Sequence, residues 1–218
     1  FKYFQKTFAD AYFKTISDSL KWNAPNQLLL GGRYAVSTPE AVASCAQYCD
    51  VLSFNMYTLK PQDGYDFVAL RALDKPVLIT EFNFGSADRG PFWGGVTQLA
   101  KEEDRGAAYS NFLKQAIAEP SIVGVHWFQY LDQPVTGRLL DGENGHFGLV
   151  GITDVPFQGF VDSVRKSNLA AVDQLGKEAQ KAKAASAVRE SEGGRSGSAG
   201  KGAGQGAGHA GGHSGNGH

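Results

Sequence analysis

Four apolar runs that alternate with helical segments constrain the fold of this chain more than any other feature. They lie at residues 27–34, 50–58, 75–85 and 121–132, and none keeps the two-residue alternation of a strand with one wet face. Continuous apolar runs of this kind are typical of parallel strands whose two faces are both covered. The sequence therefore predicts an α/β fold with four parallel strands and with helices outside the sheet.

Helical segments precede, separate and follow these runs. Thr38 and Pro39 have the residue types of an N-cap and a first helical position, and Asn23 and Pro25 end the first helix. The expected helices span about residues 1–23, 38–49, 64–74 and 101–120, and a last one begins near Gly159. Two architectures share the resulting order α-β-α-β-α-β-α-β-α: an open doubly wound sheet and part of a (β/α)8 barrel.

Polar and aromatic residues at the strand ends favour the barrel. No glycine-rich phosphate loop follows a strand, and barrel enzymes build their sites at the carboxyl ends of the strands. A complete barrel has about 250 residues, so four strand–helix units correspond to half of one. The residues at the four strand ends are Arg33 and Tyr34, Asn55 and Tyr57, Glu81 and Asn83, and His126, Trp127 and Gln129. Among them Arg33 and Asn55 are candidate substrate-binding residues.

Composition changes sharply near the C-terminus. Residues 193–218 contain almost no apolar side chain larger than alanine and cannot offset their ordering entropy, so a disordered Gly-rich tail is expected there. Residues 176–192 are expected to form a charged, alanine-rich helical extension, which leaves residues 1–175 as the folded domain. The formal net charge of −1 and the lack of an apolar run near the roughly 20 residues that span a bilayer indicate neither a nucleic-acid nor a membrane partner.

Cys45 and Cys49 lie four residues apart in a predicted helix. They are either a disulfide or metal pair, or two small buried hydrophobic residues on one helix face, and we favour the second interpretation. Neither interpretation identifies the redox compartment of the protein.

The stretch VLITEFNFG carries an acid, Glu81, at the end of an apolar run. Such an acid is either a helix cap or ion-pair partner, or a catalytic group; here a loop rich in Gly, Pro and aromatic residues follows it, not the start of a helix. A carboxylate stabilises the positive charge that develops at an anomeric carbon and can bond to it. Tyr57, which ends the neighbouring run, either donates its hydroxyl to Glu81 and keeps it ionised, or is a core aromatic with a wet tip.

Aromatic residues near the strand ends suit sugar binding, because the C–H faces of sugars stack on indole rings. Strand alternation would put Trp127 and Gln129 on one side of the last strand and His126 on the other, so we expect Trp127 and Gln129 in the groove. Phe92 and Trp93 lie in a loop, where they form either a second stacking platform or anchors that pack against the domain.

Three longer motifs, VLITEFNFG, GVHWFQYLDQPVTGR and DGENGHFGLVGITDVPF, resemble the C-terminal half of the catalytic barrel in the β-agarases of glycoside hydrolase family fifty. The resemblance covers about residues 1–170 and implies strands five to eight, with their helices, of a TIM (β/α)8 barrel. Through the wider clan of retaining glycosidases it implies Glu81 as the nucleophile, Tyr57 as its hydrogen-bond donor and Trp127 as a subsite aromatic. The loop after the last strand resembles the wall of the substrate site, with Asp132, Arg138, Glu143 and Asn144 as candidate contacts.

The sequence departs from this family in one respect. A retaining mechanism needs a second carboxyl group, the acid/base, about 5–5.5 Å from the nucleophile. By resemblance this group ends strand four, ahead of the helix in which the chain begins; Glu40, Asp50 and Glu143 are not placed to replace it. We expect the chain alone to be inactive, and unstable or self-associating, because half a barrel leaves two open strand edges.

The expected function is therefore that of a fragment of a retaining glycoside hydrolase that cleaves β-1,4-galactosidic bonds in agarose or neoagaro-oligosaccharides by double displacement. The expected partner is an agarose-type polysaccharide or oligosaccharide, and no cofactor or metal ion is required. Two alternatives are a β-galactosidase-like hydrolase that acts on another galactan and a carbohydrate-binding pseudoenzyme. The size of agarose implies a secreted or periplasmic full-length protein, and the sequence does not indicate an oligomeric state.

Overall fold

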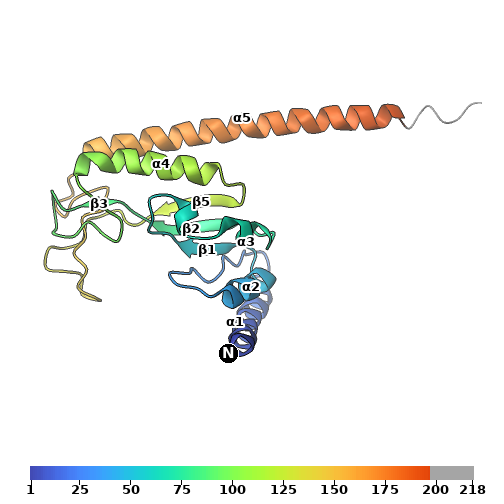
Figure 1. The fold of residues 1–218 in the computed structure, drawn as a ribbon, viewed down its shortest axis with the longest axis horizontal. Coiled ribbons are helices and arrows are strands. Elements are labelled where there is room, and N and C mark those ends of the chain that lie inside the picture. Colours follow the sequence, from blue (N-terminus) through green and yellow to red (C-terminus); the bar gives the residue numbers. More distant parts are fainter. Residues whose placement is uncertain (197–218) are drawn as a thin grey trace, which may run out of the picture. The chain divides into compact units, whose positions relative to one another are not determined.

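A computed structural model describes residues 1–196 of the chain, and for residues 188–196 the backbone alone (Figure 1). Two compact units divide the chain, Phe1–Asp173 and Gln174–His218. The last helix, α5 (Gln158–Ser196), begins in the first unit and makes up the described part of the second. The first four residues of the tail that was predicted to be disordered are thus helical, and the rest of that tail lies outside the described residues.

The other helices are α1 (Lys2–Asn23), α2 (Pro39–Tyr48), α3 (Phe67–Arg71) and α4 (Arg105–Ile117), with 3-10 turns at Pro61–Asp63 and Glu102–Asp104. The strands are β1 (Leu52–Asn55), β2 (Val77–Phe82), β3 (Gly85–Ser86), β4 (Gln98–Leu99) and β5 (Ile122–Trp127). From α2 onward helices and strands alternate as the apolar pattern predicts, except that two short strands, β3 and β4, follow β2; no strand separates α1 from α2. Thr38 caps α2 as predicted, because its side-chain oxygen accepts a hydrogen bond from the Ala41 N–H at 3.3 Å.

The main sheet has the strand order β1-β2-β5, and both strand pairs are parallel. In register, Asn55 faces Glu81 across the first pair and Phe82 faces Trp127 across the second. Figure 1 shows these three strands side by side, with α4 next to β5. The carboxyl ends of the strands therefore lie at one edge, where the predicted site residues are expected. The fold is α/β with a parallel sheet, as predicted.

The first predicted strand, residues 27–34, does not form. Only Tyr34 makes a β-bridge, to Phe54, and the segment before it is held by the Leu29 carbonyl, which accepts hydrogen bonds from two backbone N–H groups after α2. Gly31 and Arg33 have left-handed φ angles of 86° and 45°, which turn the backbone out of the extended conformation. Leu28 is 66% exposed, so this apolar run is not covered on both faces.

Aromatic rings fill the space between the main sheet and α4. Phe82 of β2 stacks on Phe112 of α4, with ring centroids 4.2 Å apart and nearly parallel planes. Phe84 and Tyr109 complete this buried group. Such burial of large apolar rings contributes on the order of 1.5–3 kcal/mol for each ring, so this layer anchors the segment that follows Glu81.

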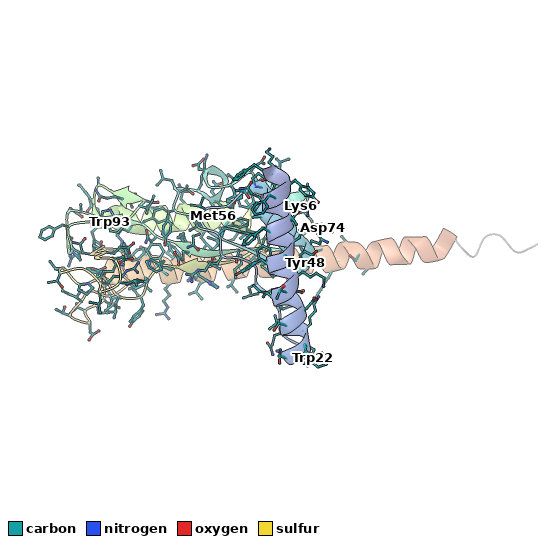
Figure 2. All side chains as sticks on the ribbon, turned by 90° about the horizontal axis from the view of Figure 1, so that it is seen from below. Lys6, Trp22, Tyr48, Met56, Asp74 and Trp93 are labelled. Carbon is teal, nitrogen blue, oxygen red and sulfur yellow. The ribbon has the colours of Figure 1, made fainter. Side chains whose placement is uncertain are left out.

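Helix α1 buries only a narrow stripe. Ala9, Phe13 and Ser17, spaced by four residues, face the domain. Large aromatic side chains on the rest of the helix are exposed: Phe1, Tyr3, Phe4, Phe8, Tyr12 and Trp22. Figure 2 shows Trp22 at the end of α1 away from Lys6. No helix in the described residues is long and apolar enough to cross a membrane.

Candidate active site

The carboxylate of Glu81 is held from two sides at the carboxyl end of β2. The Tyr57 hydroxyl donates a hydrogen bond of 2.5 Å to Oε2 of Glu81. The guanidinium of Arg33 pairs with the other oxygen, Oε1. The Glu81 side chain is 14% exposed, so both bonds lie in a partly dry environment where they are stronger than in water. The hydrogen bond from Tyr57 that the sequence predicts is present.

Arg33 reaches Glu81 from a strained backbone position. Its left-handed φ of 45° is uncommon for a residue with a Cβ atom and costs on the order of 1–3 kcal/mol. The Arg33 N–H donates to Oγ of Ser53 at 2.9 Å, and Tyr34 exchanges backbone hydrogen bonds with the β1 residues Ser53 and Asn55. These bonds hold the strained residue in place. Arg33 was predicted to bind substrate, and the structure places its charge on the carboxylate.

Tyr57 is a persistent hydrogen-bond donor. Burial, followed by its hydrogen bond to Glu81 and the negative charge of that carboxylate, raises the pKa of Tyr57 far above its usual value. The phenol therefore keeps its proton across the ordinary pH range. It therefore holds Oε2 of Glu81 in a fixed orientation as a donor.

A second charged cluster lies in the loop after β5. Glu143 accepts a hydrogen bond of 2.7 Å from Nε2 of Gln133 and forms an ion pair of 3.1 Å with Arg138. Arg138 also holds Asp141 through two hydrogen bonds, and this contact, followed by the charge of Glu143, raises the pKa of the guanidinium. The charge of Glu143 also contributes to the raised pKa of Tyr57, so the two clusters are within electrostatic range.

A groove of about 610 Å³ runs along this loop, and Gln129, Gln133, Val135 and Arg138 are among its lining residues. Gln129 is half-buried there, and its amide donates to the carbonyl of Leu131 at 2.9 Å. The groove thus shares Gln133 and Arg138 with the Glu143 cluster. A larger cavity, of about 810 Å³, lies near the start of α4 and contains none of the predicted site residues.

Trp127, predicted to line the groove, packs on an aromatic layer formed with α4 and α5. Its indole ring packs against Phe82, Tyr109 of α4 and Phe160 of α5, with centroids 5.2–5.6 Å apart. Its N–H donates to the carbonyl of Phe147 at 3.1 Å. The register of β2 and β5 is irregular between Ile79 and Phe82, so simple alternation does not predict the side that Trp127 faces. The half-buried ring packs against the hydrophobic core on this side.

Asp132, predicted as a substrate contact, is also buried. It is 5% exposed, its Oδ1 accepts the N–H of Gly148 at 2.6 Å, and its Oδ2 lies 2.7 Å from Nδ1 of His146. Nε2 of His146 lies 2.6 Å from Glu102, whose two carboxylate oxygens both accept hydrogen bonds from Nη1 of Arg105. This buried network joins two loops and the start of α4. Sequence reasoning missed it, because its members are 14 to 44 residues apart.

The buried network is electrically balanced. Burial lowers the pKa of His146, but its hydrogen bonds to Asp132 and Glu102 outweigh this effect and leave the pKa above its usual value. With a charged imidazole, two cations face two carboxylates. Arg105 has no exposed side-chain surface and donates to the carbonyls of Phe84 and Gly148. Asp132 therefore holds the loop that carries the groove, and it is also one of the residues that line the groove.

The remaining predicted residues lie at the edges of the site. Asn55, in register with Glu81, accepts a hydrogen bond of 3.0 Å from Thr80. Trp93 is half-buried, pairs with Gly145 in a β-bridge and packs on Phe147, so it is an anchor of its loop. Phe92 beside it is 79% exposed, and the Asn144 amide donates to Val135 at 3.5 Å. Within the part of the chain that the structure describes, no group of His, Cys, Asp and Glu is arranged to hold a metal ion.

Comparison with curated proteins identifies two related sequences. The chain is 43% identical over 159 residues to β-agarase B of Vibrio sp. (strain JT0107), and 40% identical over 167 residues to β-agarase A of the same strain. These matches cover 72% and 74% of this chain and 17% of each relative. The chain thus spans about a sixth of the length of these relatives. No family model matches the chain.

Solved structures of agarases superpose on most of the chain. An agarase named AgWH50C matches with a TM-score of 0.71 and 36% identity over 76% of this chain and 26% of that one. An exo-β-agarase matches with a TM-score of 0.75 and 37% identity over 79% of this chain and 23% of that one. PfGH50B matches with a TM-score of 0.75 and 34% identity over 79% of this chain and 25% of that one. The sequence matches and the structure matches therefore both include agarases.

Proposed function

The chain is a homologue of the β-agarases of glycoside hydrolase family fifty over about three quarters of its length, and on this premise we propose that it is part of a retaining glycoside hydrolase. The substrate is agarose or a neoagaro-oligosaccharide, and the bond cleaved is the β-1,4-galactosidic bond. The proposal includes a secreted or periplasmic location for the full-length protein, because the polymer is too large to enter a cell.

The observation that carries this proposal is the Glu81 carboxylate with its two donors. A nucleophile in double displacement must be ionised and must point at the anomeric carbon. Tyr57 and Arg33 each hold one oxygen of the carboxylate and restrict its orientation. Glu81 has the position and the partners for attack on a sugar carbon, and it is the nucleophile in this proposal.

The acid/base of the proposed mechanism belongs to a part of the enzyme that this chain does not span. The hydrogen bonds and ion pairs of Glu81 within the described residues involve no second carboxyl group. The chain covers about a quarter of the solved agarases. In this proposal it supplies strands five to eight of a (β/α)8 barrel, and the other half supplies the acid/base and closes the sheet.

The groove along the β5–α5 loop is the proposed wall of the substrate site. Gln129, Arg138 and Glu143 present amide, guanidinium and carboxylate groups that suit the hydroxyls of a sugar. Asn144 lies next to Glu143 and adds an amide, while Asn55 lies beside the nucleophile. Trp93 contributes through the position of its loop, because its ring packs on Phe147.

The proposal is tested with an activated donor, 2-deoxy-2-fluoro-β-galactosyl fluoride. Fluoride leaves without help from a general acid, so a nucleophile without its acid/base partner can still form the glycosyl ester. Intact-mass spectrometry should show one added glycosyl group on the chain and none on the Glu81→Gln variant. The matched control, Glu143→Gln, should still be labelled. A neoagaro-oligosaccharide should slow the labelling of the wild-type chain.

Two outcomes contradict the proposal. A folded chain that binds the neoagaro-oligosaccharide but takes no label would be a carbohydrate-binding protein. A chain whose label is displaced by another galactan and not by the neoagaro-oligosaccharide would be a hydrolase of a different substrate class. Circular dichroism of each variant establishes that the compared chains are folded.

A further inference from the structure

Two cysteines outside the candidate active site lie in direct contact at the end of α2. Cys45 is in the last turn of the helix, and Cys49 is its C-cap. Their sulfur atoms are 3.1 Å apart and joined by a hydrogen bond, and both cysteines are free. Cys45 is 0% and Cys49 is 2% exposed. The pair is therefore a buried dithiol whose two sulfurs already face each other.

The backbone of α2 permits a bond between the two sulfurs. Residues four apart on an α-helix are separated by a rise of about 6 Å along a cylinder of about 2.3 Å radius, which gives a Cα–Cα distance of about 6.2 Å. Disulfides are found with Cα–Cα distances of about 4.4–6.8 Å. The sulfurs must approach each other by about 1 Å to reach the disulfide bond length of about 2.05 Å. Side-chain rotation in the last, least restrained turn of the helix can supply this movement.

The surroundings make the two thiols chemically different. The hydrogen bond with Cys49 lowers the pKa of Cys45 against the opposing effect of burial, whereas the hydrogen bond with Cys45, together with burial, raises the pKa of Cys49 far above its usual value. Lys75 places its ammonium group 2.9 Å from the Cys49 carbonyl, and its positive charge favours a thiolate nearby. In the closed pair, Cys45 is therefore the sulfur suited to attack, and Cys49 is the sulfur suited to be attacked.

We propose that Cys45 and Cys49 form a redox site that closes to an intramolecular disulfide by exchange with a low-molecular-weight disulfide of the glutathione type. Cys49, at the helix end, becomes accessible when the last turn of α2 opens. Opening also removes the contact with Cys45 and the burial that raise the pKa of Cys49, so that its thiolate forms and attacks one sulfur of the small disulfide. The first small thiolate leaves and takes up the proton that Cys49 lost. A mixed disulfide on Cys49 results.

The second step closes the protein disulfide. The Cys45 thiolate attacks Sγ of Cys49, the bond to the small molecule breaks, and the second small thiolate leaves with the proton from Cys45. In total, two protein thiols are oxidised, one small disulfide is reduced to two thiols, and no other reactant is needed. Reduction by excess small thiol reverses both steps.

The site is connected to the segment that carries Arg33. A Cβ atom on Gly31 would lie 3.3 Å from Sγ of Cys45, so this sulfur packs against the segment two residues before Arg33. The Leu29 carbonyl accepts hydrogen bonds from the N–H groups of Asp50 and Val51, directly after Cys49. The disulfide therefore cross-links the helix end on which residues 29–33 rest. This inference does not depend on the proposed glycosidase activity.

The test compares the exchange equilibrium of the folded and unfolded chain. The purified chain is equilibrated with reduced and oxidised glutathione at pH 8, with and without urea, then acid-quenched and alkylated for intact-mass and peptide analysis. Because the fold holds the sulfurs in contact, we expect the disulfide to be favoured at least about tenfold more in the folded chain than in urea. The linked peptide should contain both cysteines of one chain.

Single-cysteine variants test the order of the two steps. In Cys45→Ser the remaining Cys49 should accumulate the mixed glutathione disulfide, whereas in Cys49→Ser the buried Cys45 should stay reduced. An equal exchange equilibrium with and without urea would overturn the proposal, and so would a disulfide between two chains. Preferential glutathione attachment to Cys45 would overturn the proposed order of attack. Thermal melts of the reduced proteins identify any variant that does not fold.

Discussion

Two clusters of the same kinds of side chain serve different purposes in this molecule. In one, Arg33 and Tyr57 hold Glu81; in the other, Arg105 and His146 hold Glu102. Both glutamates have 14% exposed side chains. The difference lies in their partners: the Arg33 side chain is 56% exposed, whereas those of Arg105 and His146 are fully buried.

This difference indicates which cluster is organised for chemistry. In the second cluster both cations are fully buried and the charges balance internally, so it joins segments of the fold. The Glu81 cluster lies at the carboxyl ends of the strands, is open on its arginine side, and rests on a strained residue at position 33. Strain and incomplete burial persist at functional sites, because the surrounding structure holds them there. The following predictions test this contrast in order of decreasing effect.

Loss of Arg105 should have the largest effect on stability. Arg105→Met leaves the carboxylates of Glu102 and Asp132 with His146 as their one cation in this network, and it leaves the Phe84 and Gly148 carbonyls without these donors. We expect the free energy of unfolding to fall by about 3–5 kcal/mol, measured by urea denaturation. The matched variant Arg33→Met should change it by no more than about 1 kcal/mol. Equal effects would remove the distinction between the clusters.

Loss of the Tyr57 hydroxyl should mainly affect reactivity. Tyr57→Phe keeps the ring but removes the donor to Oε2 of Glu81. Hydrogen bonds to charged groups contribute about 1.5–3 kcal/mol, so the rate of glycosyl labelling should fall roughly 10- to 100-fold. Tyr109→Phe, which removes a hydroxyl bonded to Asn168 in the helix layer, is the matched control and should label at the wild-type rate. Unchanged labelling of Tyr57→Phe would show that the carboxylate does not need this donor.

Arg33 should have a smaller effect on the same rate. Its side chain is more than half exposed, and such pairs contribute up to about 1 kcal/mol. Arg33→Met should therefore slow labelling by up to roughly fivefold, and Arg33→Lys should recover part of the loss by restoring the charge. A loss equal in both variants would mean that the shape of the guanidinium, and not its charge, positions Glu81.

Near neutral pH, above the range in which the carboxyl groups titrate, the pH dependence of stability should report on His146. Its pKa is raised in the folded chain, where Asp132 and Glu102 accept its hydrogen bonds and Arg105 lies nearby. The stabilisation from the charged imidazole is therefore complete below the unfolded pKa of about 6.5 and is lost as the pH rises through the folded pKa. Urea denaturation of the wild type at a series of pH values should show this decline. His146→Gln should lack it; the same decline in the variant would assign it to another group.

The sequence predicts those parts of the fold that depend on short-range patterns. The parallel order and the meeting of Tyr57 with Glu81 follow from apolar runs that end in polar residues. The failed strand at residues 27–34 depends on left-handed backbone at Gly31 and Arg33. An arginine gives no local signal for such a conformation, which is held by hydrogen bonds to β1.

Long-range packing determines two further features that the sequence pattern does not reveal, the packing of Trp127 and the partners of His146. Trp127 faces the aromatic layer with α4 and α5 because the β2–β5 register is irregular, which a count of alternate residues does not reveal. The partnership of His146 with Asp132 and Glu102 joins residues from two loops. A histidine between glycine and phenylalanine has no pattern that distinguishes it from a surface residue. The packing of Trp127 and the partners of His146 can be identified only from the tertiary structure.

The central claim is that Glu81, and not the equally exposed Glu102, is the reactive carboxylate. The most direct measurement is a peptide map of the wild-type chain after reaction with 2-deoxy-2-fluoro-β-galactosyl fluoride. The account predicts that the glycosyl ester is found on the peptide that contains Glu81 and that the peptide containing Glu102 is unmodified. A label on the Glu102 peptide, or one distributed over many acidic peptides, would contradict it.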